Sequence, residues 1–307
     1  MRYGIPHRGS KCRIAPWVVS HLPAAPVLVD LPAAPVLVDL FAGGCAVTHC
    51  ALLSGKWPHV VANDLTDAPE VFRDSIFGEY DGYSTVHTRE EFKRDKDWDM
   101  AEALLYSFGN NTANYLWGPR YEGVKAAASR MVSAPSTHER RMAYKAFCRE
   151  LKAFLERPEA MDSMDSLGKL QGLQGLERMQ GLEGLQGLQG LEISRASYDE
   201  VVIPQGACVY ADPPYRWTGC TEADGTACTG DMRGMGGGTG GFDSDAFDAW
   251  LARVPFPVYV SEFTAPAGCV EIASTERKAS MSANGKTSRQ TERLFVQERF
   301  AAKAVEE

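Results

Sequence analysis

Residues 36–45 read Val-Leu-Val-Asp-Leu-Phe-Ala-Gly-Gly-Cys. The apolar run Val36–Leu40 predicts a buried strand. The two glycines after it predict a tight turn into a helix, with backbone amides that a ligand can approach. A strand followed by a glycine turn and a helix is the repeating unit of an α/β sheet, so this stretch predicts that fold class. An ordinary βα turn has the same appearance, and a ligand therefore needs further evidence.

Strand patterns occur on both sides of a region with a different composition. After residues 36–40 we expect strands at 59–62, 201–203, 208–211, 258–261, 270–273 and 293–297, and helices at 136–157 and 243–253. The intervening region is rich in charged and aromatic residues. We therefore predict one sheet domain, formed by residues 1–65 and 200–307, that is split by a mainly helical or irregular insert at 66–199.

Composition excludes several protein classes. The chain has 307 residues, a hydrophobic fraction of 44% and a net charge of −8. It shows no apolar run long enough to span a membrane and no signal-peptide core at the N-terminus. The eight cysteines form no CxxC pair, which is typical of reduced thiols in a cytoplasmic protein. Because the net charge is acidic, any nucleic-acid site requires a local basic patch.

Two repeats interrupt the chain. Residues 22–30 and 31–39 are identical, and only the second copy continues into the glycine turn. The first copy indicates a recent duplication, and it either forms a surface loop or competes for the strand position. In residues 167–192, Leu or Met recurs at every third position with many glycines. A period of three does not match an α-helix, and we predict no catalytic role for this segment.

The glycine turn favours one kind of nucleoside ligand. The spacing GxGxxG of dinucleotide sites is absent, and so is the Lys-Ser/Thr of a phosphate-binding loop. Asp64, about twenty-five residues after Asp39, stands where an acidic side chain accepts hydrogen bonds from a ribose diol. A nucleoside without a pyrophosphate fits these residues better than NAD does, which points to S-adenosylmethionine.

A second motif, Asp212-Pro213-Pro214-Tyr215, follows the predicted strand 208–211. Two prolines fix φ and remove two backbone donors, and Asp212 is pushed away from helical geometry. The expected loop is stiff and holds an acidic acceptor, free carbonyls and an aromatic face close together. Such a loop suits a planar ring that bears an amino group.

These motifs together resemble the Dam-like DNA adenine-N6 methyltransferases, particularly the phage and prophage branch. The motifs that carry the resemblance are Tyr3–Lys11, Asp39–Cys45, Asn63-Asp64 and Asp212–Tyr215. Cys45 stands where the family has a glycine. The order of donor loop, long insert and catalytic loop is also the one that this family uses.

The resemblance implies a Rossmann-like sheet with helices on both faces, S-adenosylmethionine as the methyl donor, and no metal. Donor binding is implied for Tyr3, Gly9, Lys11, Asp39, Phe41, Ala42, Gly43, Gly44 and Asp64. The catalytic residues implied are Asp212, Pro213, Pro214 and Tyr215. The Asp212 carboxylate and the Pro213 carbonyl accept the N–H bonds of adenine, and Tyr215 stacks on a base flipped out of double-stranded DNA. The insert then corresponds to a target-recognition domain, and we expect a cytoplasmic monomer.

Contacts to DNA are expected from basic residues near the C-terminus and in the insert. The candidates are Arg277, Lys278, Lys286, Arg289 and Arg120, of which the first four lie in or beside a Ser/Asn/Gly-rich segment. Asn110, Asn111 and Asn114 either read base edges or form turns. The basic helix face of Arg140, Arg141, Lys145 and Arg149 is better explained as a solvated surface.

Three alternatives remain open from the sequence. The same loop chemistry serves methylation of the cytosine-N4 amine or of a base amine in RNA. The duplication, Cys45 and an enlarged glycine-rich loop at 216–241 are also compatible with an inactive nucleic-acid-binding relative. The target sequence and the biological role, whether restriction-modification, an orphan mark or phage defence in a bacterial host, do not follow from the residues.

Overall fold

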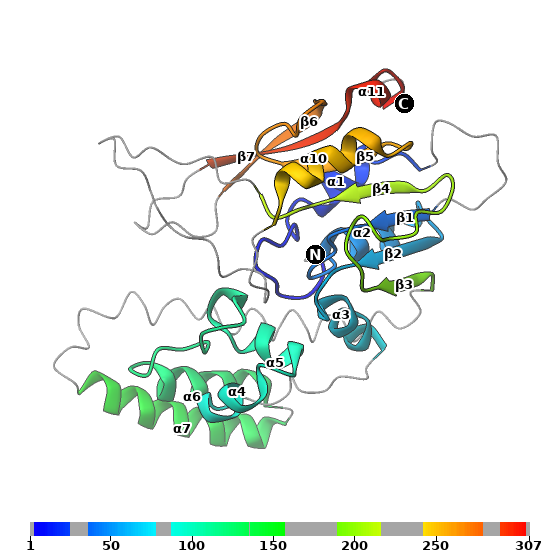
Figure 1. Ribbon diagram of the computed structural model, residues 1–307. Coiled ribbons are helices and arrows are strands. Elements are labelled where there is room, and N and C mark those ends of the chain that lie inside the picture. Colours follow the sequence, from blue (N-terminus) through cyan, green and yellow to red (C-terminus); the bar gives the residue numbers. More distant parts are fainter. Residues whose placement is uncertain are drawn as a thin grey trace, which may run out of the picture. The chain divides into compact units, whose positions relative to one another are not determined.

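The computed structural model describes residues 3–24, 36–77, 87–134, 136–156, 189–215, 242–278 and 289–304 (Figure 1). The chain divides into two compact units. The first comprises Met1–Cys12, Gly43–Ala46 and Thr66–Leu188, and the second comprises Arg13–Ala42, Val47–Leu65 and Gln189–Glu307.

A seven-stranded sheet forms the centre of the second unit, in the order β3-β2-β1-β4-β5-β7-β6. Its strands are β1 (Val36–Asp39), β2 (His59–Asn63), β3 (Leu191–Ser194), β4 (Cys208–Ala211), β5 (Val258–Glu262), β6 (Cys269–Lys278) and β7 (Arg289–Gln297), as Figure 1 shows. The first five strands pair in parallel, whereas β7 runs antiparallel to both β5 and β6. This topology confirms the predicted α/β class and the Rossmann-like sheet.

Helices cover both faces of this sheet. Successive side chains of a strand point to opposite faces. Val38 and Leu40 pack in one apolar cluster with Phe247 and Leu251 of α10 (Ser244–Arg253). Asp39 points to the other face, where Thr48 of α2 (Ala46–Ser54) donates a hydrogen bond to it. The predicted two-faced arrangement is thus confirmed. The remaining helices of this unit are α1 (Ala15–His21) and α11 (Glu298–Ala304).

The strand order reverses between β1 and β4. The chain moves from β1 outward to β2 and β3, then returns to β4 on the other side of β1 and continues to β5. Open α/β sheets bind ligands at the carboxyl ends of the strands, at the point where the order reverses. This places the expected site at the ends of β1 and β4.

The predicted insert is helical, and its helices belong to the first unit. They are α3 (Ala68–Phe77), α4 (Arg89–Asp95), α5 (Met100–Leu105), the short 3₁₀ helix η2 (Phe108–Asn110), α6 (Glu122–Ser133) and α7 (Thr137–Leu155). Val124 of α6 and Phe154 of α7 are buried together. At the start of α7, Ser136 and Glu139 form a capping box, which explains why the predicted helix 136–157 begins there.

One predicted strand was wrong, and one strand was missed. Residues 201–203 are irregular: Val201 and Ile203 pack against the core, but Val202 is 88% exposed. The side chains of these residues thus alternate between buried and exposed without belonging to a strand. The position beside β2 in the sheet is occupied by β3. β3 lies at the end of the region 66–199 that we expected to be the insert, so the chain returns to the sheet earlier than predicted. The assignment of the two regions to catalysis and target recognition stays a proposal.

The repeats lie largely outside the described residues, which exclude 25–35 of the duplicated nonapeptides and 167–188 of the Leu/Met repeat. The glycine-rich stretch 230–241 lies outside them as well. The last repeat glycine, Gly190, is described and has a structural role. Its φ is +89°, its carbonyl accepts a hydrogen bond from Val60 N at 2.8 Å, and a Cβ there would lie 2.0 Å from the Pro58 carbonyl oxygen.

None of the helices in the described ranges is long and apolar enough to cross a membrane. The cysteines within these ranges carry free thiols; they are Cys12, Cys45, Cys50, Cys148, Cys208 and Cys269.

We predict that Gly190→Ala destabilises the second unit more than Gly55→Ala does. Both glycines have positive φ, so each substitution costs about 1 kcal/mol of backbone strain. Only at Gly190 does the new Cβ also collide with backbone, since nothing lies within 4 Å of a Cβ at Gly55. Urea unfolding of the two variants measures the difference. Equal losses of stability would contradict the close packing of Gly190 against β2.

Candidate active site

Three carboxylates gather at the carboxyl ends of adjacent parallel strands. Asp39 is the last residue of β1, Asp64 follows β2, and Asp212 follows β4. β1 lies between β2 and β4, and both Asp64 and Asp212 act electrostatically on Asp39. The sheet therefore joins the predicted donor-binding acids and the predicted catalytic acid in one site.

Asp39 is buried, and its pKa is raised. Its side chain is 1% exposed; Oδ2 accepts a hydrogen bond from Thr48 Oγ1 at 2.8 Å, and Oδ1 has no hydrogen-bond partner among the described residues. Burial raises the pKa of Asp39 to about 7; the Thr48 hydrogen bond opposes this shift, and the charges of Asp212 and Asp64 add to it. A buried carboxylate with an open acceptor favours a ligand that brings a positive charge or an N–H group.

Asn63 ties the loops of this site together. Its amide nitrogen donates to the carbonyls of Leu40 and Ala196, each at 3.0 Å, and its amide oxygen accepts from Ala196 N at 3.1 Å. The Asn63 carbonyl also accepts from Ala42 N at 2.8 Å. The side chain is 1% exposed. Asn63 belongs to the Asn63-Asp64 motif, but this role depends on contacts with the ends of β1 and β3, which the motif does not reveal.

The N-terminal motif packs on the glycine turn within the first unit. Ile5 N donates to the Gly44 carbonyl at 2.8 Å, and the His7 side chain lies against Gly43 and Gly44. A Cβ at Gly4 would lie 2.1 Å from the Gly44 oxygen, so only glycine fits there. The N-terminal motif is thereby in contact with the predicted donor-binding residues Gly43 and Gly44. That Gly43 and Gly44 bind the donor stays a prediction.

The other residues of the N-terminal motif differ in exposure. Tyr3 is half-buried, Gly9 is exposed with a φ of +77°, and Lys11 is 5% exposed. Their expected contribution to a donor site shared with Asp39 stays a prediction.

Cys45 has a backbone conformation that favours glycine. Its φ is +57°, in the left-handed region that favours glycine, and its side chain is fully buried. The thiol lies 3.9 Å from the Gly43 carbonyl oxygen. The left-handed conformation of a residue with a side chain adds local backbone strain to this turn.

Phe41 anchors the start of the donor loop in an aromatic cluster. Its ring stacks on Tyr198 at 5.6 Å between centroids and meets Phe242 and Phe247 edge-on. Its neighbour Ala42 is buried. The Phe41 side chain is thus engaged in packing on one side, and donor contact by Phe41 and Ala42 stays a prediction.

The predicted catalytic loop, Asp212–Tyr215, follows β4 without regular secondary structure. Asp212 is half-buried, Pro213 buried and Pro214 exposed. The Tyr215 hydroxyl donates a hydrogen bond to the carboxylate of Glu292 on β7, and its ring meets Phe263 edge-on at 4.6 Å. Glu292 was not a predicted site residue, because only the pairing of β7 with β5 brings it to this loop.

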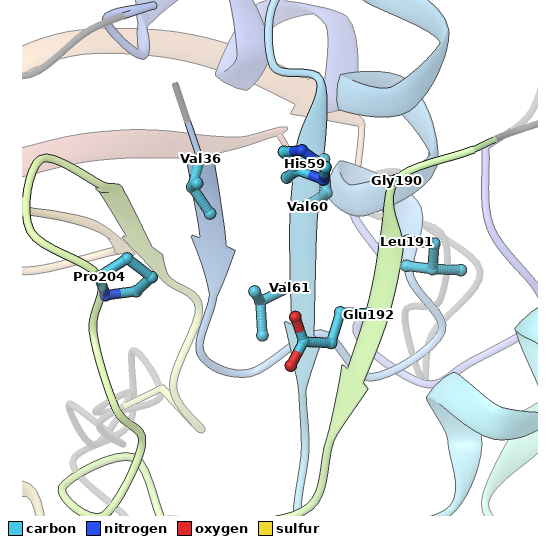
Figure 2. A pocket seen from close by; sticks show the side chains of 8 residues that line it. All are labelled: Val36, His59, Val60, Val61, Gly190, Leu191, Glu192 and Pro204. Atoms are coloured by element: carbon cyan, nitrogen blue, oxygen red, sulfur yellow. The ribbon is translucent and has the colours of Figure 1, made fainter. Parts of the chain in front are cut away.

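A hollow of about 320 Å³ lies at the opposite end of the sheet (Figure 2). Val36 and His59, which begin β1 and β2, line it, and so does Gly190 just before β3. The acidic residues lie at the carboxyl ends of the same strands. This hollow is consequently separate from the candidate active site.

The predicted DNA contacts are only partly described. Arg277 and Lys278 end β6 and pair with the start of β7, where Arg289 lies; their side chains, and all of Lys286, fall outside the described residues. Arg120 is exposed and its guanidinium lies 5.9 Å from the Tyr121 ring centroid. Contact of these residues with DNA stays a prediction.

The asparagines of the insert serve a turn. Asn110 Nδ2 donates to the Leu104 carbonyl at 2.7 Å, and Asn111 Oδ1 accepts from the backbone of Ala113 and Asn114 at 3.0 Å. Of the two readings of Asn110 and Asn111, the structure favours turn residues. The α7 residues Arg140, Arg141, Lys145 and Arg149 are exposed, as expected of a solvated face.

Within the described part of the chain, no group of three or more His, Cys, Asp or Glu side chains is arranged to hold a metal ion.

Comparison with known proteins gives one family match. Residues 7–102 match the family model of the D12 class N6 adenine-specific DNA methyltransferases. The family resemblance is confirmed over this stretch, which contains part of the N-terminal motif, the donor loop and Asn63-Asp64. The Asp212–Tyr215 loop lies outside the matched residues.

Other comparisons give less. No curated protein matches the chain. Among the matching solved structures is the rRNA methyltransferase aviRa from Streptomyces viridochromogenes, with 15% sequence identity, a TM-score of 0.34, and coverage of 96% of this chain and 86% of that chain.

We predict that Asp39→Asn raises the stability of the ligand-free protein above neutral pH. The folded protein retains a proton on Asp39 that the unfolded chain releases near pH 4, so wild-type stability falls between about pH 4 and pH 7. Asparagine avoids this loss and can still accept from Thr48. The gain approaches about 4 kcal/mol at pH 8 and vanishes near pH 4.

Urea unfolding of both proteins at pH 4, 6 and 8 measures this difference. A variant that is no more stable than the wild type at pH 8 would show that the pKa of Asp39 is not raised in the folded protein.

Proposed function

We propose that the chain transfers a methyl group from S-adenosylmethionine to the exocyclic N6 amine of adenine in DNA. The observation that carries the proposal is the convergence of Asp39, Asp64 and Asp212 at the carboxyl ends of β1, β2 and β4, beside the Pro-Pro-Tyr loop. The family match over residues 7–102 supports the reaction class and the DNA substrate.

The donor fits the residues of the site. S-adenosylmethionine supplies the methyl group when it is bound. Asp64 accepts hydrogen bonds from its ribose diol, while the open Asp39 Oδ1 and the negative charges nearby favour its positive charge. We assign Tyr3, Gly9, Lys11 and the backbone of residues 41–44 to the same site.

The base is handled by the catalytic loop. The Asp212 carboxylate and the Pro213 carbonyl accept the two N–H bonds of the adenine amine. This drives the nitrogen towards tetrahedral geometry and frees its lone pair, which forms the new nitrogen–carbon bond as the methyl–sulfur bond breaks and its electron pair stays on sulfur. The methylated amine then gives up one proton to solvent water. Tyr215 stacks on the base, which first has to leave the duplex. The rate comes from orientation and electrostatics.

In this proposal the DNA backbone is contacted by Arg120 in the insert and by the basic residues near the C-terminus, Arg277, Lys278, Lys286 and Arg289. The protein then acts as a cytoplasmic monomer on double-stranded DNA, within a bacterial cell. Incubation of DNA and RNA oligonucleotides with labelled donor tests the substrate. Sequencing of modified adenine after expression in a methylation-free host gives the target site.

We predict that Asp212→Ala abolishes methyl transfer but leaves donor binding intact. Loss of the acceptor lowers the rate by a factor on the order of a thousand, because the nitrogen lone pair stays delocalised in the ring. Transfer of labelled methyl groups gives the rate, and calorimetry gives the donor affinity. Glu298→Ala, a change of an exposed acid on α11, serves as the control and keeps full activity. Retained methylation by Asp212→Ala refutes the role of Asp212.

We also predict that donor affinity rises with pH up to neutrality. The pKa of Asp39 is about 7 in the ligand-free protein, and a cationic donor favours the ionised form. The dissociation constant therefore falls by up to about tenfold per unit between pH 5 and 7 and levels off above pH 7. Asp39→Asn removes this dependence. Calorimetry across this range provides the test, and absence of donor binding at any pH excludes the enzymatic function.

A further inference from the structure

The antiparallel direction of β7 brings its first half to the catalytic loop. Glu262, the last residue of β5, pairs with Arg293 of β7. Glu292 therefore lies one residue further along the sheet, beside the turn that Phe263 begins. The parallel strands end at this edge of the sheet, and the antiparallel strand β7 places an acidic side chain, Glu292, at the same edge.

Glu292 is fully buried, at 0% exposure. A carboxylate in such a position needs hydrogen-bond donors to offset its lost hydration. The Tyr215 hydroxyl is one such donor, and burial, with the charges of Asp212 and Glu292, raises the pKa of Tyr215 well above its ordinary value. The hydroxyl therefore stays protonated at neutral pH and continues to donate.

Phe263 restrains the same ring from another side. Its ring meets Tyr215 edge-on, at an interplanar angle of 84°. The position of Phe263 is itself fixed, because its N–H donates to Glu262 Oε1 at 2.8 Å and its carbonyl accepts from Arg293 Nη1 at 2.7 Å. Tyr215 is thus held at its hydroxyl and at its ring edge.

We infer that Glu292 is a positioning residue: its carboxylate holds the Tyr215 hydroxyl and so sets the plane on which the target base stacks. The inference rests on the proposed function, in which Tyr215 contacts the base. Glu292 acts through Tyr215 and touches neither the donor nor the reacting nitrogen.

A double-mutant cycle on methyl transfer tests this inference. Tyr215→Phe and Glu292→Ala each lower kcat by about tenfold, since the ring loses its orientation, and the double variant is no slower than either. Glu292→Gln keeps an acceptor oxygen and retains most of the activity. Donor affinity is unchanged throughout. Glu298→Gln, which changes an exposed acid on α11, keeps wild-type activity.

An oligonucleotide with 2-aminopurine at the target position reports stacking directly. Its fluorescence in the complex rises in Glu292→Ala and in Tyr215→Phe, because the base is less well stacked, and stays low in Glu292→Gln. Wild-type transfer by Glu292→Ala, or losses that multiply in the double variant, overturns the inference.

Failure of the proposed function can be distinguished from failure of the inference about Glu292. If the wild type methylates no DNA or RNA oligonucleotide, the enzymatic proposal fails, and urea unfolding then tests the contact alone. Tyr215→Phe lowers the urea midpoint when Glu292 is present and not when it is alanine, as expected of a buried acceptor that loses its donor. Equal shifts in both backgrounds contradict the contact.

Discussion

The side-chain amide of Asn63 is the constraint on which the candidate site depends. It connects the loop after β1 with the segment after β3, while its own backbone ends β2. Three neighbouring strands thus end in mutually bonded loops, and Asp39 and Asp64 are held at a fixed separation. Since the hydrogen bond to Leu40 is buried and the two with Ala196 are part-buried, loss of the amide leaves several polar groups without partners, each at a cost of about 1–3 kcal/mol.

Two features of the candidate site lower the stability of the folded protein. Asp39 is buried beside two like charges, and its pKa of about 7 expresses that penalty. Cys45 adds backbone strain in the turn that follows. Sites that bind charged ligands often store such strain, because the ligand relieves it. The acid on β7, Glu292, belongs to the same pattern of buried charge near the catalytic loop.

Local signals predicted the central elements well. β1, β2, β4 and β5 are short apolar runs, and α7 and α10 have clear boundaries, so their positions follow from neighbouring residues alone. β3 was missed because Leu191–Ser194 mixes polar and apolar residues and adjoins a repeat, whereas residues 201–203 were assigned as a strand for their β-branched side chains. The motif acids were found from spacing. The clamp by Asn63 and the contact of Glu292 with Tyr215 depend on strand pairing across more than fifty residues, which no local pattern encodes.

The acids at the ends of β1, β2 and β4 bear on the end of the catalytic cycle as well as its start. A sulfonium donor carries a positive charge, and the thioether that remains after methyl transfer carries none at sulfur. Carboxylates that attract the former gain nothing from the latter. On the proposed function, the same buried negative charge that recruits the donor therefore weakens retention of the spent molecule and limits product inhibition.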